Sequence, residues 1–197
     1  MSSADVEVYS ALSQVLSRLG LRWYVFGAQA AILYGAARFT EDIDVTVEIG
    51  TLEASALVSA LVSGGFTPRI SDRKFIDQTR VIPVLHESTK IPIDIVLAGP
   101  GIEELFFDGA RLVDVSGEPV PVASPEDLVV MKVLAGRPKD LEDVVAVVAA
   151  QEEFDEKRAR WLIGLLQQAL DQSDLLPVFE RCLTRAARAR KLRQRDR

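Results

Sequence analysis

Two aspartates, Asp42 and Asp44, stand two residues apart in a stretch where polar and apolar residues alternate, residues 42–49. Such alternation predicts a β-strand with one buried face, and side chains two apart on a strand point to the same side. Two carboxylates held this close repel each other unless a cation lies between them. Mg²⁺ prefers oxygen ligands and commonly binds one or two carboxylates together with phosphate oxygens. The pair therefore predicts a metal site for a phosphate-bearing substrate, the alternative being that Asp42 only caps or solvates a turn.

A third acid, Asp94, interrupts the apolar segment Ile91–Leu97, which predicts another strand. A charge in such apolar surroundings is costly without a partner. Two explanations remain open: the Asp94 carboxylate is a third metal ligand, or it pairs with an arginine such as Arg38 or Arg80.

The elements that position these acids follow from hydrophobic periodicity. The apolar run Leu21–Phe26 predicts a strand that ends at Gly27, and a helix over residues 28–34 begins directly afterwards. A helix N-terminus that follows a glycine offers free N–H groups to an anion. Strands at 79–85 and 91–97 are joined by a hairpin at His86–Lys90, which places His86 on the surface. Further helices are expected at 4–19, 52–63, 103–108, 124–135, 138–150, 156–171 and 175–191, and further strands at 111–115 and 120–122.

These elements predict an α/β (α+β) fold in two parts. Residues 1–123 form a mixed β-sheet core flanked by helices, and residues 124–197 form a C-terminal helical region. Ser124 and Pro125 begin that region with a strong helix start, because serine caps a helix and proline fits its first position.

The spacing of the motifs resembles the DNA polymerase beta-type nucleotidyltransferase superfamily. The resemblance rests on Phe26-Gly27-Ala28, then Arg38-Phe39-Thr40-Glu41-Asp42-Ile43-Asp44-Val45, then Ile93-Asp94-Ile95, and it covers most of residues 20–148. The phrase R-x-T-x-D-I-D most resembles the AbiEii/AbiGii branch of toxin-like nucleotidyltransferases. The resemblance implies a nucleotidyltransferase core that uses Mg²⁺ or Mn²⁺ to move a nucleotidyl group from a nucleoside triphosphate to an acceptor hydroxyl.

The family's catalytic roles carry over to individual positions. The resemblance implies that Asp42 and Asp44 bind both metal ions, and that Asp94 binds the catalytic metal and helps to deprotonate the acceptor hydroxyl. Gly27 would let the backbone approach the triphosphate. The superfamily usually follows this glycine with serine or glycine, whereas this chain has Ala28, which lacks the hydroxyl and puts triphosphate affinity in doubt.

The resemblance implies that Arg38 and Thr40, just before Asp42, also contact the nucleotide. Arg38 would lie near the phosphates, since guanidinium pairs well with phosphate oxygens; alternatively it only neutralises the acids, and Thr40 only shapes the turn before the strand. The branch's later motifs supply a phosphate-binding lysine, matched by Lys132, and a further acid, matched by Asp140 or Asp143. The alternative for Lys132 is a solvated helix lysine.

Charge and composition bear on partners and compartment. Residues 181–197 carry a net charge of +7, which leaves −13 on the rest of a chain whose overall charge is −6. This basic tail predicts contact with a polyanion such as RNA, or alternatively a solvated helix end. One cysteine, Cys182, excludes an internal disulfide and favours the cytoplasm. We see no signal peptide or membrane span, and the toxin-like resemblance implies a cognate antitoxin as a further partner.

Three functions are compatible with these patterns. The first is an enzyme that modifies RNA, in the manner of toxin–antitoxin-type enzymes. The second is a nucleotidyltransferase that acts on a protein or a small hydroxylated molecule. The third is a catalytically inactive binding module with the same fold, which Ala28 favours.

Overall fold

The computed structural model describes residues 2–70 and 72–195, and the chain forms two compact units. The sheet unit comprises residues 1–29 and 40–122, and the helical unit comprises residues 30–39 and 123–197. Helix α2 (Gly27–Leu33) begins in the first and continues into the second. The predicted fold class, a mixed α/β fold, is confirmed.

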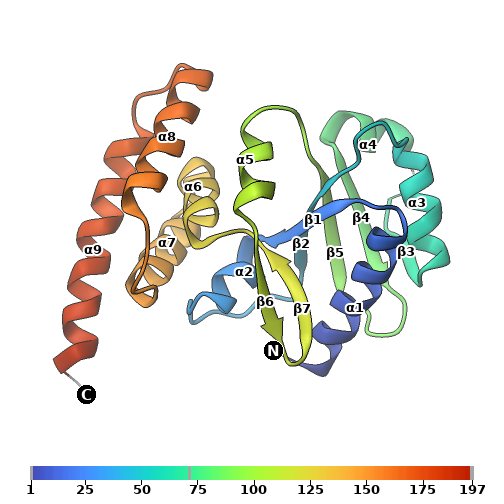
Figure 1. The fold of residues 1–197 in the computed structure, drawn as a ribbon, viewed down its shortest axis with the longest axis horizontal. Helices are drawn as coiled ribbons and strands as arrows, with labels where there is room; N and C mark the ends of the chain where they lie inside the picture. The colour runs from blue at the N-terminus through green and yellow to red at the C-terminus, as the bar shows by residue number, and fades with distance from the viewer. Residues whose placement is uncertain (1, 71, 196–197) are drawn as a thin grey trace. The chain divides into compact units, whose positions relative to one another are not determined.

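The described strands of the sheet unit form one seven-stranded mixed sheet in the order β3-β4-β5-β2-β1-β7-β6 (Figure 1). The strands are β1 (Arg22–Phe26), β2 (Ile43–Glu48), β3 (Phe66–Pro68), β4 (Val81–His86), β5 (Pro92–Leu97), β6 (Arg111–Val115) and β7 (Glu118–Val122). The β2–β5 and β1–β7 pairs are parallel, and the remaining neighbours are antiparallel. Strand β2, which contains Asp44 and directly follows Asp42, therefore lies inside the sheet between β1 and β5.

Alternation along β2 and β5 separates an apolar face from a carboxylate face. Ile43, Val45 and Val47 of β2 are fully buried, as are Ile93 and Ile95 of β5. Because parallel partners in register point to the same side, these residues form one continuous apolar layer. Asp44 and Asp94 consequently share the opposite face.

The helices of the sheet unit are α1 (Ser3–Arg18), α3 (Ala54–Ser63), α4 (Arg73–Thr79) and α5 (Ile102–Gly109). Helix α1 buries Val8, Leu12 and Leu16 at helical spacing and contacts β1, β7 and α3. Helix α5 packs Phe107 against Tyr24 of β1, with ring centroids 4.9 Å apart. Since Tyr24 and Phe26 alternate with the buried Trp23 and Val25, α5 lies on the carboxylate face of the sheet.

The helical unit contains the rest of α2 and helices α6 (Pro125–Ala135), α7 (Pro138–Ala150), α8 (Glu156–Leu170) and α9 (Leu175–Arg195). Helix α7 contacts α6 and α9, and α8 contacts the same two helices (Figure 1). The predicted start of α6 is confirmed: the Ser124 hydroxyl accepts from the Asp127 N–H at 3.1 Å, and Pro125 occupies the first turn. In the described residues no helix has the length and apolar character needed to cross a bilayer.

Two elements were not predicted, and one residue was placed wrongly. Strand β3 is only three residues long, and α4 buries only Ile76, so neither gives a periodic signal. His86 was expected on the surface but is 5% exposed. It is the last residue of β4 and the register partner of Phe66 in β3, whose ring lies 5.1 Å from the imidazole. The missed strand therefore explains the error.

Candidate active site

Asp44 and Asp94 are direct register partners on the parallel strands β2 and β5. Partners in register point to the same side of a sheet, so the two carboxylates, 50 residues apart in the chain, share one face. Both side chains are half-buried. This pairing joins a D-x-D acid to the third acid of the motif within one compact unit.

Asp42 lies immediately before β2 and is exposed. Its carboxylate accepts a hydrogen bond from the Thr40 hydroxyl. Thr40 thus shapes the turn that leads into β2, which was one of the two predictions for this residue. Its partner in this turn is Asp42, a predicted metal ligand.

The Asp94 carboxylate is paired with an arginine that the sequence did not point to. Arg69 donates to Asp94, and both side chains are 39% exposed. The two arginines considered from sequence are engaged elsewhere: Arg80 donates to the carbonyls of Leu97 and Ala98, at 3.0 and 2.6 Å, and Arg38 pairs within the helical unit. Arg69 escaped sequence reasoning because its position depends on the short strand β3.

Two features require glycine at position 27: the backbone conformation there and the closeness of the Asp44 side chain. The Gly27 φ of +66° lies in the left-handed region, which residues other than glycine rarely adopt. A Cβ at this position would also lie 2.7 Å from Cγ of Asp44 and 2.9 Å from its Cβ. Phe26 is the register partner of Asp44, so the strand ends directly beside the carboxylate. Gly27 therefore makes room for Asp44; the next residue, Ala28, is buried.

A buried network of opposite charges joins α6, α7 and the segment after α2 in the helical unit. The Lys132 ammonium lies 2.7 Å from Oδ2 of Asp143 and 3.6 Å from Oδ1 of Asp140. Arg38 contacts the same Asp143 oxygen at 2.6 Å. Lys132 is 5% exposed, so it is not a solvated helix lysine. Asp143 thus contacts both Lys132 and Arg38, the two cations that were predicted to bind the nucleotide.

Asp140 is held by a second arginine. Arg137 donates to its two carboxylate oxygens at 2.5 and 3.1 Å. Burial is the largest single influence and raises the pKa of Asp140, but the Arg137 hydrogen bond and the charges of Lys132, Arg137 and Lys139 together outweigh it, so the pKa is lowered. Asp140 is therefore kept ionised.

The ligand chemistry of Asp42, Asp44 and Asp94 fits a divalent metal ion. Three carboxylates offer the oxygen ligands that Mg²⁺ and Mn²⁺ prefer. Among the described residues, no three acidic, histidine or cysteine side chains are already arranged as a metal site. The Asp42 carboxylate accepts a hydrogen bond from Thr40, and the Asp94 carboxylate is paired with Arg69.

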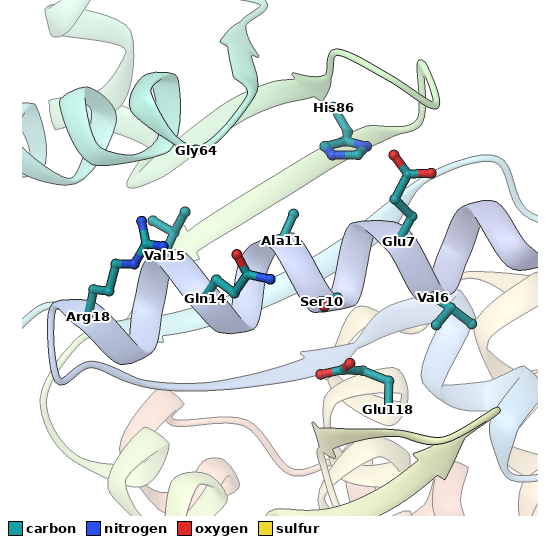
Figure 2. A pocket seen from close by; sticks show the side chains of 10 residues that line it. All are labelled: Val6, Glu7, Ser10, Ala11, Gln14, Val15, Arg18, Gly64, His86 and Glu118. Atoms are coloured by element: carbon teal, nitrogen blue, oxygen red, sulfur yellow. The ribbon is translucent and has the colours of Figure 1, made fainter.

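A separate cavity of about 410 Å³ lies along α1 in the sheet unit. Its lining includes Glu7, Arg18, His86 and Glu118 but none of the three aspartates. Figure 2 shows Glu7 and Arg18 near opposite ends of the lined stretch of α1, with His86 beyond the helix on the side of Glu7. The imidazole Nδ1 is 3.0 Å from the Thr89 hydroxyl. This cavity is not part of the carboxylate site.

Three solved structures similar to this chain are of a nucleotidyltransferase or of a nucleotidyltransferase-like protein. The solution structure of the antibiotic-resistance factor ANT(2'')-Ia matches with a TM-score of 0.59 at 13% identity, covering 87% of this chain and 95% of that one. Its crystal structure in complex with adenylyl-2''-tobramycin gives 0.60 at 13% identity, covering 85% and 99%. An antigenic nucleotidyltransferase-like protein from Paracoccidioides brasiliensis gives 0.55 at 16% identity, covering 88% and 91%. The chain thus has the nucleotidyltransferase fold.

The family follows from the sequence match. The family described as nucleotidyl transferase AbiEii toxin, type IV toxin–antitoxin system, matches residues 10–197. The chain belongs to this AbiEii nucleotidyltransferase family, and the predicted resemblance is confirmed. No curated protein sequence matches the chain.

Proposed function

We propose that the protein is a metal-dependent nucleotidyltransferase whose metal ligands are Asp42, Asp44 and Asp94. The observation that carries the proposal is the register of β2 against β5, which aligns Asp44 with Asp94 on one face. Asp42 adds a third carboxylate two residues before Asp44. Membership of the AbiEii family supports nucleotidyl transfer as the reaction and a nucleoside triphosphate as the donor.

The reaction moves a nucleotidyl group to a hydroxyl. The acceptor oxygen forms a bond to the α-phosphorus as the bond from that phosphorus to the bridging oxygen breaks, and pyrophosphate leaves. Asp94 takes the hydroxyl proton, and Asp42, Asp44 and Asp94 would hold the metal. Bound divalent ions would supply positive charge that acidifies the hydroxyl and neutralises the phosphates.

Residues from the remaining motifs are proposed to handle the triphosphate. Gly27 and Ala28 offer backbone N–H groups, and Arg38 offers a guanidinium that is 23% exposed. Because Lys132 is buried on Asp143, we propose that it acts by holding that carboxylate in place for Arg38. Asp140, the further acid of the predicted nucleotide-binding residues, accepts a hydrogen bond from Arg137.

We propose RNA as the acceptor, bound through basic side chains of α9. Arg181 and Arg188 are exposed on this helix and available to phosphates. Other basic residues of the predicted Arg181–Arg197 tail have structural roles: Arg185 pairs with Glu142 at 2.7 Å, and Arg190 donates to the carbonyls of Ala149 and Gln151. Asp196 and Arg197 lie outside the described residues. The toxin–antitoxin description of the family supports an antitoxin as a further partner.

Two other functions are separated from RNA modification by the same experiment. ANT(2'')-Ia, which has this fold, was solved with an adenylylated aminoglycoside, and this favours a small hydroxylated acceptor as the second candidate. An inactive binding module is the third, favoured by Ala28.

Transfer of label tests the proposal directly. The protein is incubated with Mg²⁺ and each α-labelled nucleoside triphosphate, with total RNA, the protein itself and a panel of aminoglycosides as acceptors. We expect label on RNA with wild type and none with Asp44→Asn. Label on a small molecule or on protein would replace RNA as the acceptor, and the absence of both transfer and Mg²⁺-dependent nucleotide binding would contradict the enzyme.

A further inference from the structure

Arg69 stands in the same lateral row of the sheet as the two central carboxylates. Asp94 is the register partner of Asp44 on one side and of Pro83 on the other. Pro68 of β3 pairs with Val84, and the Arg69 N–H donates to the Pro83 carbonyl at 2.8 Å, which continues this register by one residue. Arg69 is thus opposite Pro83, and its side chain rises on the carboxylate face.

The intervening residue explains how Arg69 reaches Asp94. Two strand spacings, about 10 Å, separate their backbones. Pro83 presents only a compact ring between them, and the long arginine stem spans this distance so that the guanidinium meets the carboxylate. Pro83 has no N–H to return to Arg69, which agrees with the end of β3 at Pro68. The ion pair is therefore placed by backbone register.

The Arg69–Asp94 pair is open to exchange. Both side chains are 39% exposed, and ion pairs with this access to water contribute little to stability. Asp94 is also one of the acids whose chemistry suits a divalent cation. A guanidinium on the carboxylate both competes for its oxygens and repels an incoming cation.

We propose that Arg69 is the resident counter-ion of Asp94, neutralising it before metal binds and leaving it when metal arrives. Metal binding and release of Arg69 are then one coupled exchange. The inference rests on the proposed metal site and adds a residue that sets the affinity of that site. Arg69 is a positioning residue here, since it acts through Asp94.

Mn²⁺ affinity of the nucleotide-free protein tests the exchange by titration calorimetry. Arg69→Gln removes the competing cation and is expected to bind Mn²⁺ roughly three- to tenfold more tightly than wild type. Arg69→Lys retains the charge and should stay closer to wild type. Arg73→Gln is the matched control: it removes the same charge four residues away, from an arginine 3.8 Å from Glu53. It should leave Mn²⁺ affinity unchanged.

A double-mutant cycle assigns the effect to Asp94. In an Asp94→Asn background, Arg69→Gln should no longer tighten Mn²⁺ binding. If wild type binds Mn²⁺ and Arg69→Gln binds it equally or more weakly, the exchange is wrong while the metal site stands. If neither protein binds Mn²⁺, the metal site and the exchange are both contradicted. Thermal unfolding of each variant shows whether the fold is retained.

Discussion

Asp44 is the best-defined residue of the candidate site. It has register partners on both sides, Phe26 in β1 and Asp94 in β5, and Gly27 leaves the space its carboxylate occupies. A side chain placed by neighbours on two strands is pre-organised, so it need not be ordered when metal and substrate bind.

Asp44→Asn should abolish nucleotidyl transfer without unfolding the protein. The amide lacks the negative charge that is proposed to hold the metal, and metal stabilisation of a transition state amounts to several kcal/mol, or at least about 100-fold in rate. Transfer rates measured beside thermal unfolding check this. Asp77→Asn, at an exposed aspartate of the same unit, is the control and should retain full activity. Substantial activity in Asp44→Asn would remove Asp44 from the site.

Gly27→Ala should damage both stability and metal binding. A left-handed backbone costs a non-glycine residue about 1–2 kcal/mol, and here the new methyl group also displaces Asp44. Gly20 provides a matched control because it has the same φ of +66° and nothing within 4 Å of an added Cβ. Chemical unfolding and Mn²⁺ titration of the two alanine variants separate the backbone cost from the clash. Equal effects of the two substitutions would contradict the role of Gly27 beside Asp44.

At the scale of elements, α6 and α7 are joined by charge as well as by apolar packing. Lys132 of α6 lies between Asp140 and Asp143 of α7, and each aspartate has its own arginine. Each aspartate therefore keeps a cation when Lys132 is lost, which limits the effect of replacing that lysine.

Lys132→Met should destabilise the protein by about 1–3 kcal/mol. That is less than the ~3–5 kcal/mol typical of a broken buried pair, because Asp143 keeps Arg38 and Asp140 keeps Arg137. Urea unfolding measures the change, with the exposed Lys139→Met as the control. An unchanged free energy of unfolding in Lys132→Met would show that the ion pairs of Lys132 add nothing to stability.

The ionised Asp140 should stabilise the folded protein at pH values above the ordinary aspartate pKa, and this stabilisation should be lost at lower pH. Its folded pKa is lowered, so the folded state favours the ionised form, and the stabilisation is lost as pH falls from about 4 through the folded pKa. Wild type should therefore lose more unfolding free energy between about pH 6 and pH 3 than Asp140→Asn does. Urea unfolding across this range tests it, with Asp174→Asn as an exposed control. Parallel pH profiles for wild type and Asp140→Asn would contradict it.

Local patterns predicted the elements of the fold except β3 and α4. Alternation marked β2 and the Ser124 cap marked α6, because each signal lies within a few residues. Strand β3 has three residues and includes Pro68, so it carries no period, and without it neither the burial of His86 nor the reach of Arg69 could be predicted. That Asp44 and Asp94 share a face depends on register, which the motif implied and strand pairing shows.

At the scale of the whole molecule, basic charge is concentrated towards the C-terminus and acidic charge elsewhere. In α9 this charge has two uses: Arg190 binds carbonyls at the end of α7, whereas Arg181 and Arg188 face solvent. Counting basic residues in the sequence could not separate these uses, because they differ only in which helix lies alongside.

Replacing both Arg181 and Arg188 by glutamine should weaken RNA binding and leave stability unchanged. Each lost phosphate contact lowers the slope of log affinity against log salt by about 0.7 for a single strand, so the pair lowers it by about 1.4. Arg190→Gln should instead lower the thermal midpoint, because it removes bonds to Ala149 and Gln151. Filter binding at several salt concentrations and thermal unfolding distinguish the two variants. An unchanged salt slope in the double variant would exclude Arg181 and Arg188 as RNA contacts.

Residues 30–39 belong to the helical unit although they are made long before its other helices. Arg38 contacts Asp143, and the Tyr34 carbonyl accepts from Gln151, so both partners leave the ribosome much later. A nascent chain that ends after β7 already carries all three aspartates but lacks what fixes Arg38. The segment that carries Arg38 can therefore take its folded position only when translation is nearly finished. A fragment truncated near residue 123 would lack the contacts that fix this segment.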